Sequence, residues 1–131
     1  MAYHRMMAIL NVGAAVTIDP TSYSNYAIGS MTYTTPNFDI IGDGDIYIQA
    51  WTASTPTYFE LEYYINDSYV GYCVVYDWGA YYVGPTTVSV SDGDQIKFRI
   101  YIGSSGIGAW EILQNDSSGD SIFTAYCTPT P

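Results

Sequence analysis

Basic residues are scarce in this sequence. Lys and Arg together number three, against thirteen Asp and Glu, which gives a net charge of −10. Arg5, Lys97 and Arg99 are too few to follow a phosphate backbone, and the excess negative charge repels nucleic acids and anionic membranes alike. Every apolar run also falls short of the roughly 18 residues that a membrane-spanning helix needs. The composition therefore predicts no nucleic-acid partner and no membrane partner.

Histidine and cysteine are also rare. A Ser–His or Cys–His nucleophile would have to use His4 near the N-terminus, and a zinc site needs more ligands than one His and two Cys. Glu60 and Glu62 lie two residues apart on one predicted strand, where they face solvent instead of each other across a cleft. We therefore expect no enzyme. Cys73 and Cys127 could form one disulfide, but we favour two buried free thiols.

Tyrosine and turn-forming residues, in contrast, are abundant. The chain has fifteen Tyr, and Gly, Pro, Asn and Asp interrupt its apolar segments at short intervals. Sustained helical periodicity is missing from every window of about 11 residues or more. Residues 1–131 are therefore predicted to form a single all-β domain, an antiparallel β-sandwich of immunoglobulin-like or jelly-roll topology with eight to ten strands.

Alternation of apolar and polar residues locates the expected strands. Asn66-Asp67 predicts a two-residue type I′ hairpin, because both residues tolerate positive φ. The expected strands are Met6–Ile18, Tyr23–Thr34, Phe38–Ile41, Ile46–Trp51, Phe59–Ile65, Tyr69–Tyr76, Val88–Ser91, Ile96–Ile102, Ala109–Gln114 and Ser121–Cys127.

The N-terminal segment is too apolar to remain exposed. Its apolar residues before Val16 include Met6, Met7, Ile9, Leu10 and Val12. Two interpretations stay open: the segment is the first strand of its own sandwich, or residues 1–18 form an arm that pairs with the sheet edge of a neighbouring subunit. Because Asn11 and Gly13 interrupt the run and no small-x-small site follows, we do not expect a cleaved signal peptide.

Three turns are rich in aspartate. Calcium takes six to eight oxygen ligands and tolerates irregular loops, so these turns are weak calcium candidates. Asp and Gly are also the default turn residues, and this second interpretation is the one we favour. A calcium site would gain support if two of the turns met. The candidates are Asp43 and Asp45, Asp92 and Asp94, and Asp116 and Asp120.

Aromatic residues suggest a possible platform for sugar rings. Amphipathic aromatics stack on sugars, but they also suit strand packing and subunit interfaces, which is the interpretation we favour. The platform candidates are Trp51, Trp78, Tyr81 and Tyr82, with Tyr101 beside them.

Two segments resemble a known family. Val88–Ile100, with two valines before a Gly-Asp turn and an alternating strand, is similar to a hairpin of immunoglobulin-like or fibronectin-like accessory domains, and Ile65–Val70 resembles the hairpin upstream of it. The resemblance covers roughly Asp45–Cys127. It departs from antibody domains, because Trp110 lies too close to Cys127. Such domains recur in phage virion proteins and bacterial surface proteins, where they decorate, extend or adhere.

The leading expectation is a non-enzymatic structural protein of a virus or phage particle: a capsid decoration, a fibre or a minor structural subunit. Its partners would be further copies of itself and other structural subunits, and its location the virion. One alternative is a carbohydrate-binding sandwich module that binds surface glycans, with or without calcium. The other is an extracellular or cell-surface filament subunit that assembles by strand exchange.

Overall fold

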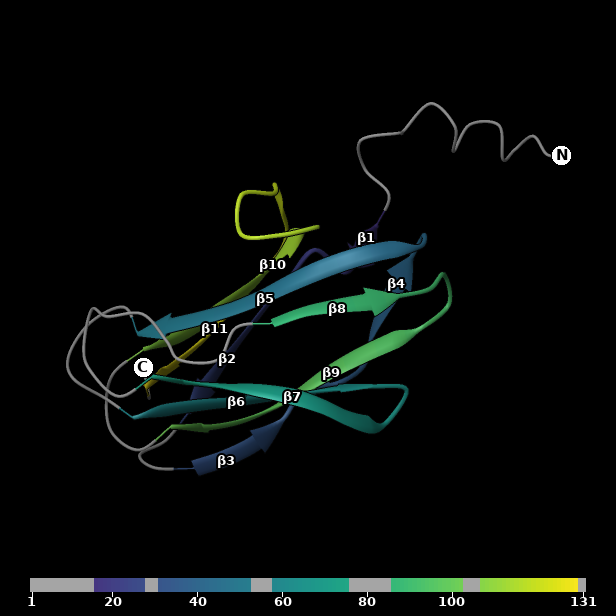
Figure 1. Ribbon diagram of the computed structural model, residues 1–131. Coiled ribbons are helices and arrows are strands. Elements are labelled where there is room, and N and C mark those ends of the chain that lie inside the picture. The colour runs from purple at the N-terminus through teal and green to yellow at the C-terminus, as the bar shows by residue number, and fades with distance from the viewer. Residues whose placement is uncertain (1–15, 28–30, 53–57, 76–85, 103–106, 130–131) are drawn as a thin grey trace, which may run out of the picture.

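The computed structural model describes residues 16–27, 31–52, 58–75, 86–102 and 107–129, and all of its regular structure is β. Within these ranges, eleven strands form two sheets that pack face to face with the core between them (Figure 1). The predicted β-sandwich is confirmed, with one strand more than the expected maximum.

The six-stranded sheet is organised around β9. β6 pairs with the whole of one side of β9, while β4 and then β3 pair with successive parts of its other side. β7 extends the sheet beyond β6, and β1 extends it beyond β4. The strands are β1 (Thr17–Asp19), β3 (Met31–Thr34), β4 (Phe38–Ile41), β6 (Phe59–Ile65), β7 (Ser68–Val75) and β9 (Gln95–Ile102).

The five-stranded sheet has the order β2-β11-β10-β5-β8. Three of its four pairings are antiparallel, but β2 runs parallel to β11. The expectation of a wholly antiparallel sandwich is therefore wrong at this edge. The strands are β2 (Ser22–Ala27), β5 (Gly44–Thr52), β8 (Thr86–Val90), β10 (Gly108–Gln114) and β11 (Ser121–Pro129).

Two further expectations about connections are wrong. The predicted strand Tyr23–Thr34 is divided into β2 and β3, which belong to different sheets. Val88–Ile100 is not a hairpin within one sheet, because β8 and β9 also lie in opposite sheets. Alternation reports which residues face inward, and it does not report which sheet a strand joins.

The predicted turn between β6 and β7 is confirmed. Asn66 and Asp67 have φ values of 50° and 67°, and Ile65 pairs with Ser68. Positive φ at both central residues is the requirement of a type I′ turn, whose twist matches that of the strands it joins.

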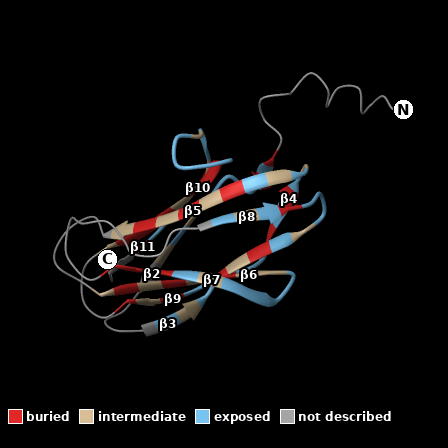
Figure 2. Ribbon diagram, viewed as in Figure 1, coloured by how far each residue is buried: buried red, intermediate tan, exposed pale blue. Residues whose placement is uncertain are grey.

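Alternating strand residues fill the core (Figure 2). Six aromatic rings form a row in which successive members come from opposite sheets, with neighbouring centroids 5.0–6.0 Å apart. Such tilted, edge-on and stacked contacts add to the energy of burying the rings. We call these residues the aromatic row, and in order they are Tyr23, Phe38, Phe123, Phe98, Trp110 and Phe59.

Neither cysteine forms a disulfide and both are fully buried, as we favoured from the sequence. Burial raises the pKa of the Cys73 thiol to about 12 and that of Cys127 to about 11. At a pH near the ordinary thiol pKa of about 8.5, we expect neither thiol of the native protein to react with Ellman's reagent within minutes. Denaturant should release two reactive thiols per chain. Rapid labelling of the native protein, or a mass indicating a disulfide, would contradict this prediction.

Candidate binding surface on the six-stranded sheet

Tyrosines gather on the outer side of the six-stranded sheet. Tyr64 on β6 lies opposite Tyr69 on β7, and their rings contact edge to face with centroids 5.7 Å apart. Tyr58 and Tyr101 make a similar contact at 5.8 Å. Tyr69 and Tyr72 are 55% and 51% exposed. We call these five residues the tyrosine face. Exposed tyrosines offer a large amphipathic contact area at little entropy cost, which suits a binding surface.

Charged side chains surround the tyrosine face. Glu62 accepts hydrogen bonds from the Tyr64 hydroxyl at 2.9 Å and from Arg99 Nη1 at 3.2 Å, and the first of these raises the pKa of Tyr64. Lys97 Nζ lies 2.6 Å from Asp67 Oδ1 and 5.9 Å from the centroid of the Tyr64 ring. Lys97 and Arg99 are the only Lys or Arg in the described ranges. Every basic side chain of that part of the chain therefore lies on this one face.

The strand β7 is the last described strand on one edge of the same sheet. Among the described strands it pairs only with β6, and its sequence contains neither charge nor proline. A bulge at Val70, between the pairs Tyr64–Tyr69 and Tyr63–Gly71, interrupts the ladder near the hairpin. Proteins usually protect edge strands with charges, prolines or bulges, and the stretch from Gly71 to Val75 has none of these.

The aspartate-rich turns at 42–45 and 91–95 meet at one end of the sandwich. Gly42 N donates to Asp92 Oδ1, and Asp92 N donates to Asp43 Oδ1, both at 2.8 Å. From the sequence, we expected a calcium site to gain support if two of these turns met. However, the described ranges contain no group of three or more His, Cys, Asp or Glu residues arranged to hold a metal ion.

Hydrogen bonds give the other aspartates of these turns a structural role. Asp94 accepts from Ser91 N at 2.8 Å and from Asn66 Nδ2 at 3.0 Å, and these bonds, mainly the first, lower the pKa of Asp94. Asp45 Oδ1 accepts from Ser89 Oγ at 2.8 Å. Calcium binding stays a prediction, and the hydrogen bonds favour the turn interpretation.

The third aspartate-rich turn joins β10 to β11. Asp116 Oδ1 accepts from both the backbone N and the hydroxyl of Ser118 at 2.9 Å, which lowers the pKa of Asp116. The backbone carbonyl of Asp120 accepts from Gln114 N at 2.8 Å. These bonds are those of a closed hairpin loop, in which the Asp116 carboxylate holds the backbone.

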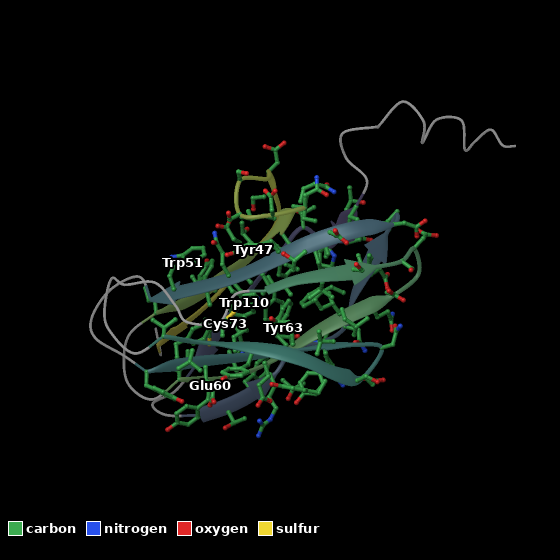
Figure 3. The ribbon with its side chains drawn as sticks, in the orientation of Figure 1. Tyr47, Trp51, Glu60, Tyr63, Cys73 and Trp110 are labelled. Carbon is green, nitrogen blue, oxygen red and sulfur yellow. The ribbon has the colours of Figure 1, made fainter. Side chains whose placement is uncertain are left out.

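The described members of the predicted sugar platform do not come together. Trp51 projects from β5 on the outer side of the five-stranded sheet (Figure 3), whereas Tyr101 belongs to the tyrosine face of the other sheet. Trp78, Tyr81 and Tyr82 lie outside the described residues. The grouping of Trp51 with Tyr101 is therefore wrong, because their strands belong to different sheets.

The predicted N-terminal arm overlaps the core. Val16 and Ile18 are buried, and Thr17–Asp19 pairs with β4 of the same chain. Its last residues are therefore part of the sandwich, and the arm hypothesis now concerns only the residues before Val16. Met6, Met7, Ile9, Leu10 and Val12 lie outside the described residues.

The candidates for catalysis have ordinary surroundings. Glu60 and Glu62 share the outer side of β6, where their cross-strand neighbours on β9 are Tyr101 and Arg99. His4 lies outside the described residues.

In the part of the chain that the structure describes, there is no helix of the length and hydrophobicity that would cross a membrane.

Sequence reasoning did not identify the tyrosine face as a group. A usable signal was present, because Glu60, Glu62 and Tyr64 alternate with core residues and so share one side of their strand. A two-residue turn at Asn66-Asp67 then brings Tyr69 opposite Tyr64.

Comparison with known proteins identifies no family. No family model matches the sequence, and no curated protein matches it. Similar solved structures include the N-terminal domain of PorA (12% identity, TM-score 0.45, covering 87% of this chain and 95% of that one). Another is the ASH/PapD-like domain 7 of human CEP192 (14% identity, TM-score 0.44, covering 90% of this chain and 87% of that one). A third is a non-cellulosomal cohesin from the hyperthermophilic archaeon Archaeoglobus fulgidus (12% identity, TM-score 0.42, covering 90% of this chain and 93% of that one). At these identities and scores, none of the three indicates what this chain binds.

Proposed function

We propose that this chain is a non-enzymatic structural subunit of a virus or phage particle, which packs against other protein subunits through β7 and the tyrosine face. The observation that carries the proposal is the edge position of β7 among the described strands. An uncharged edge offers a row of backbone donors and acceptors to a strand of another chain.

The surroundings of β7 support a protein partner. A strand of another chain that paired with β7 would lie next to Tyr69 and Tyr72, the two most exposed members of the tyrosine face. Tyr and Arg are enriched at the centres of protein interfaces, and Arg99 lies on the same face. The ion pair of Arg99 with Glu62 is exposed, so it contributes only about 0–1 kcal/mol to stability.

A donor for this edge is present in the sequence. The N-terminal segment contains Met6, Met7, Ile9, Leu10 and Val12, the apolar residues that we expect in a strand added to a neighbouring copy. The particle setting follows from the family resemblance and from the scarcity of catalytic residue types. A filament subunit on a cell surface would use the same edge, and the composition of the assembly would distinguish the two.

Tyr72→Lys is expected to weaken self-association of the full chain at least about tenfold, because it introduces a charge on this edge strand. The measurement is the mass in solution by light scattering over a range of concentrations. Deletion of residues 1–15 should have the same effect, and it leaves Val16 and Ile18 in the core.

The matched control is Thr124→Lys, which adds the same charge at an exposed position in the other sheet. This variant should associate like the unmodified chain. A full chain that remains monomeric at every concentration would refute assembly through its own edge, and equal weakening by both lysine variants would show that net charge, not β7, is responsible.

A further inference from the structure

The outer side of the five-stranded sheet carries two aromatic rings flanking a small residue. Trp51 on β5 and Tyr126 on β11 are both cross-strand neighbours of Ala109 on β10. Tyr126 is 48% exposed. Ala109 is only 7% exposed, although it is not a member of the buried core cluster between the sheets. Two strand spacings separate the aromatic residues, about 10 Å. Trp51 and Tyr47 project outward from β5, while Trp110 lies between the sheets (Figure 3).

Hydrogen-bonding side chains form the next cross-strand row. Glu111 lies opposite Gln49 on β5 and opposite Thr124 on β11, two residues along β10 from Ala109 and its neighbours Trp51 and Tyr126. Gln49 Nε2 donates to Glu111 Oε2 at 2.7 Å, which holds the two side chains together on the outer side of the sheet. A carboxylate and a carboxamide have further donor and acceptor positions, which suit hydroxyl groups.

The charge on this side of the sheet indicates a neutral ligand. Both basic residues of the described ranges lie on the tyrosine face of the other sheet. Glu111 is the charged member of the two rows, and its carboxylate is already engaged by Gln49. An anionic ligand would therefore find negative charge and no cation here.

We propose that this surface binds an extended, neutral, β-linked polysaccharide. Aromatic residues on strands two spacings apart can each stack on a sugar ring of one straight chain, because that strand spacing, about 10 Å, is close to the repeat of a disaccharide unit. Gln49, Glu111 and Thr124 would then bond the hydroxyl groups at the edge of the same sugars. Of the two platform candidates that the structure describes, Trp51 takes part and Tyr101 does not, and Tyr126 is a partner that the sequence analysis did not name. The site lies on the opposite side of the molecule from β6 and β9, so it is independent of the proposed assembly surface.

The test is calorimetric titration of the full chain with cellohexaose, xylohexaose and mannohexaose. We expect at least one of these neutral β-linked probes to bind, and Trp51→Ala and Tyr126→Ala each to weaken that binding at least tenfold. Maltohexaose, which is α-linked and curved, and an anionic galacturonate hexamer should bind at least tenfold more weakly.

Tyr72→Ala is the matched control, because it removes an equally exposed aromatic ring from the other sheet, and it should leave the affinity unchanged. Absence of binding to all three β-linked probes would overturn the proposal. Unchanged affinity in Tyr126→Ala would also overturn it, and because this ring is half exposed the variant should fold. An equal loss of sugar affinity in Tyr72→Ala would show that the sugar site lies elsewhere.

Discussion

Replacement of Gly108 by alanine is expected to destabilise the protein by about 3 kcal/mol. Gly108 on β10 packs against the ring of Phe59 on β6, and a Cβ at this position would overlap three atoms of that ring. The ring cannot move freely, because Phe59 is fully buried and its other neighbour is Trp110, with centroids 6.0 Å apart. Overpacking of a close-packed core forces side chains off their rotamers or shifts the backbone. Denaturant unfolding followed by tryptophan fluorescence measures the change.

A double-mutant cycle separates the steric cause from backbone effects. In the Phe59→Leu background, Gly108→Ala should cost much less, because the smaller side chain leaves room for the new methyl group. Gly93→Ala is the second control: its φ of 92° strains alanine, but nothing lies within 4 Å of the added Cβ. It should cost about 1 kcal/mol. Strictly additive costs for Gly108→Ala and Phe59→Leu would contradict the proposed overlap.

The core was largely predictable from the sequence, because alternation has a direct physical cause. A residue that faces the opposite sheet must be apolar, and the pattern of Ile96, Phe98, Ile100 and Ile102 on β9 is reproduced as a buried row. The Asn66-Asp67 turn was predictable for a similar local reason, since few residue types tolerate its positive φ. Both features depend on neighbours in sequence.

Sheet membership and the surfaces were not predictable in this way. The parallel pairing of β2 with β11 joins segments about a hundred residues apart, and alternation contains no information about it. Bulges at Val70 and between Ile112 and Leu113 shift the register, and a shift of one residue moves every following side chain to the other face. The neighbours of Trp51 on the outer surface therefore could not be derived from spacing.

The aspartate turns show that proximity alone does not make a metal site. Asp43 and Asp92 come from turns about fifty residues apart and meet as a calcium site would require, yet their described oxygens accept backbone N–H groups. A carboxylate that caps a turn satisfies donors that strands leave unpaired. Residue type predicted that these aspartates lie in turns, and only the register of the two sheets shows that the turns meet.

Phe98→Ala should have the largest effect of any substitution discussed, about 3–5 kcal/mol. Phe98 is fully buried at the middle of the aromatic row, where it contacts Phe123 of the other sheet at 6.0 Å and Trp110 at 5.5 Å. Removing the ring leaves a cavity between two sheets whose separation is fixed by the remaining rings, so the site cannot collapse. Such a loss is a large fraction of the 5–15 kcal/mol that stabilises a typical domain.

Denaturant unfolding of Phe98→Ala should therefore show a much lower midpoint, or a chain that is already partly unfolded in buffer. Phe98→Leu should retain most of the stability, because it preserves an apolar side chain of similar volume. Arg99→Ala, one residue along β9 on the tyrosine face, should change stability by about 1 kcal/mol or less. If Phe98→Ala cost no more than Arg99→Ala, then the rings would not be holding the two sheets together, and the row would be only a consequence of how the strands happen to pack.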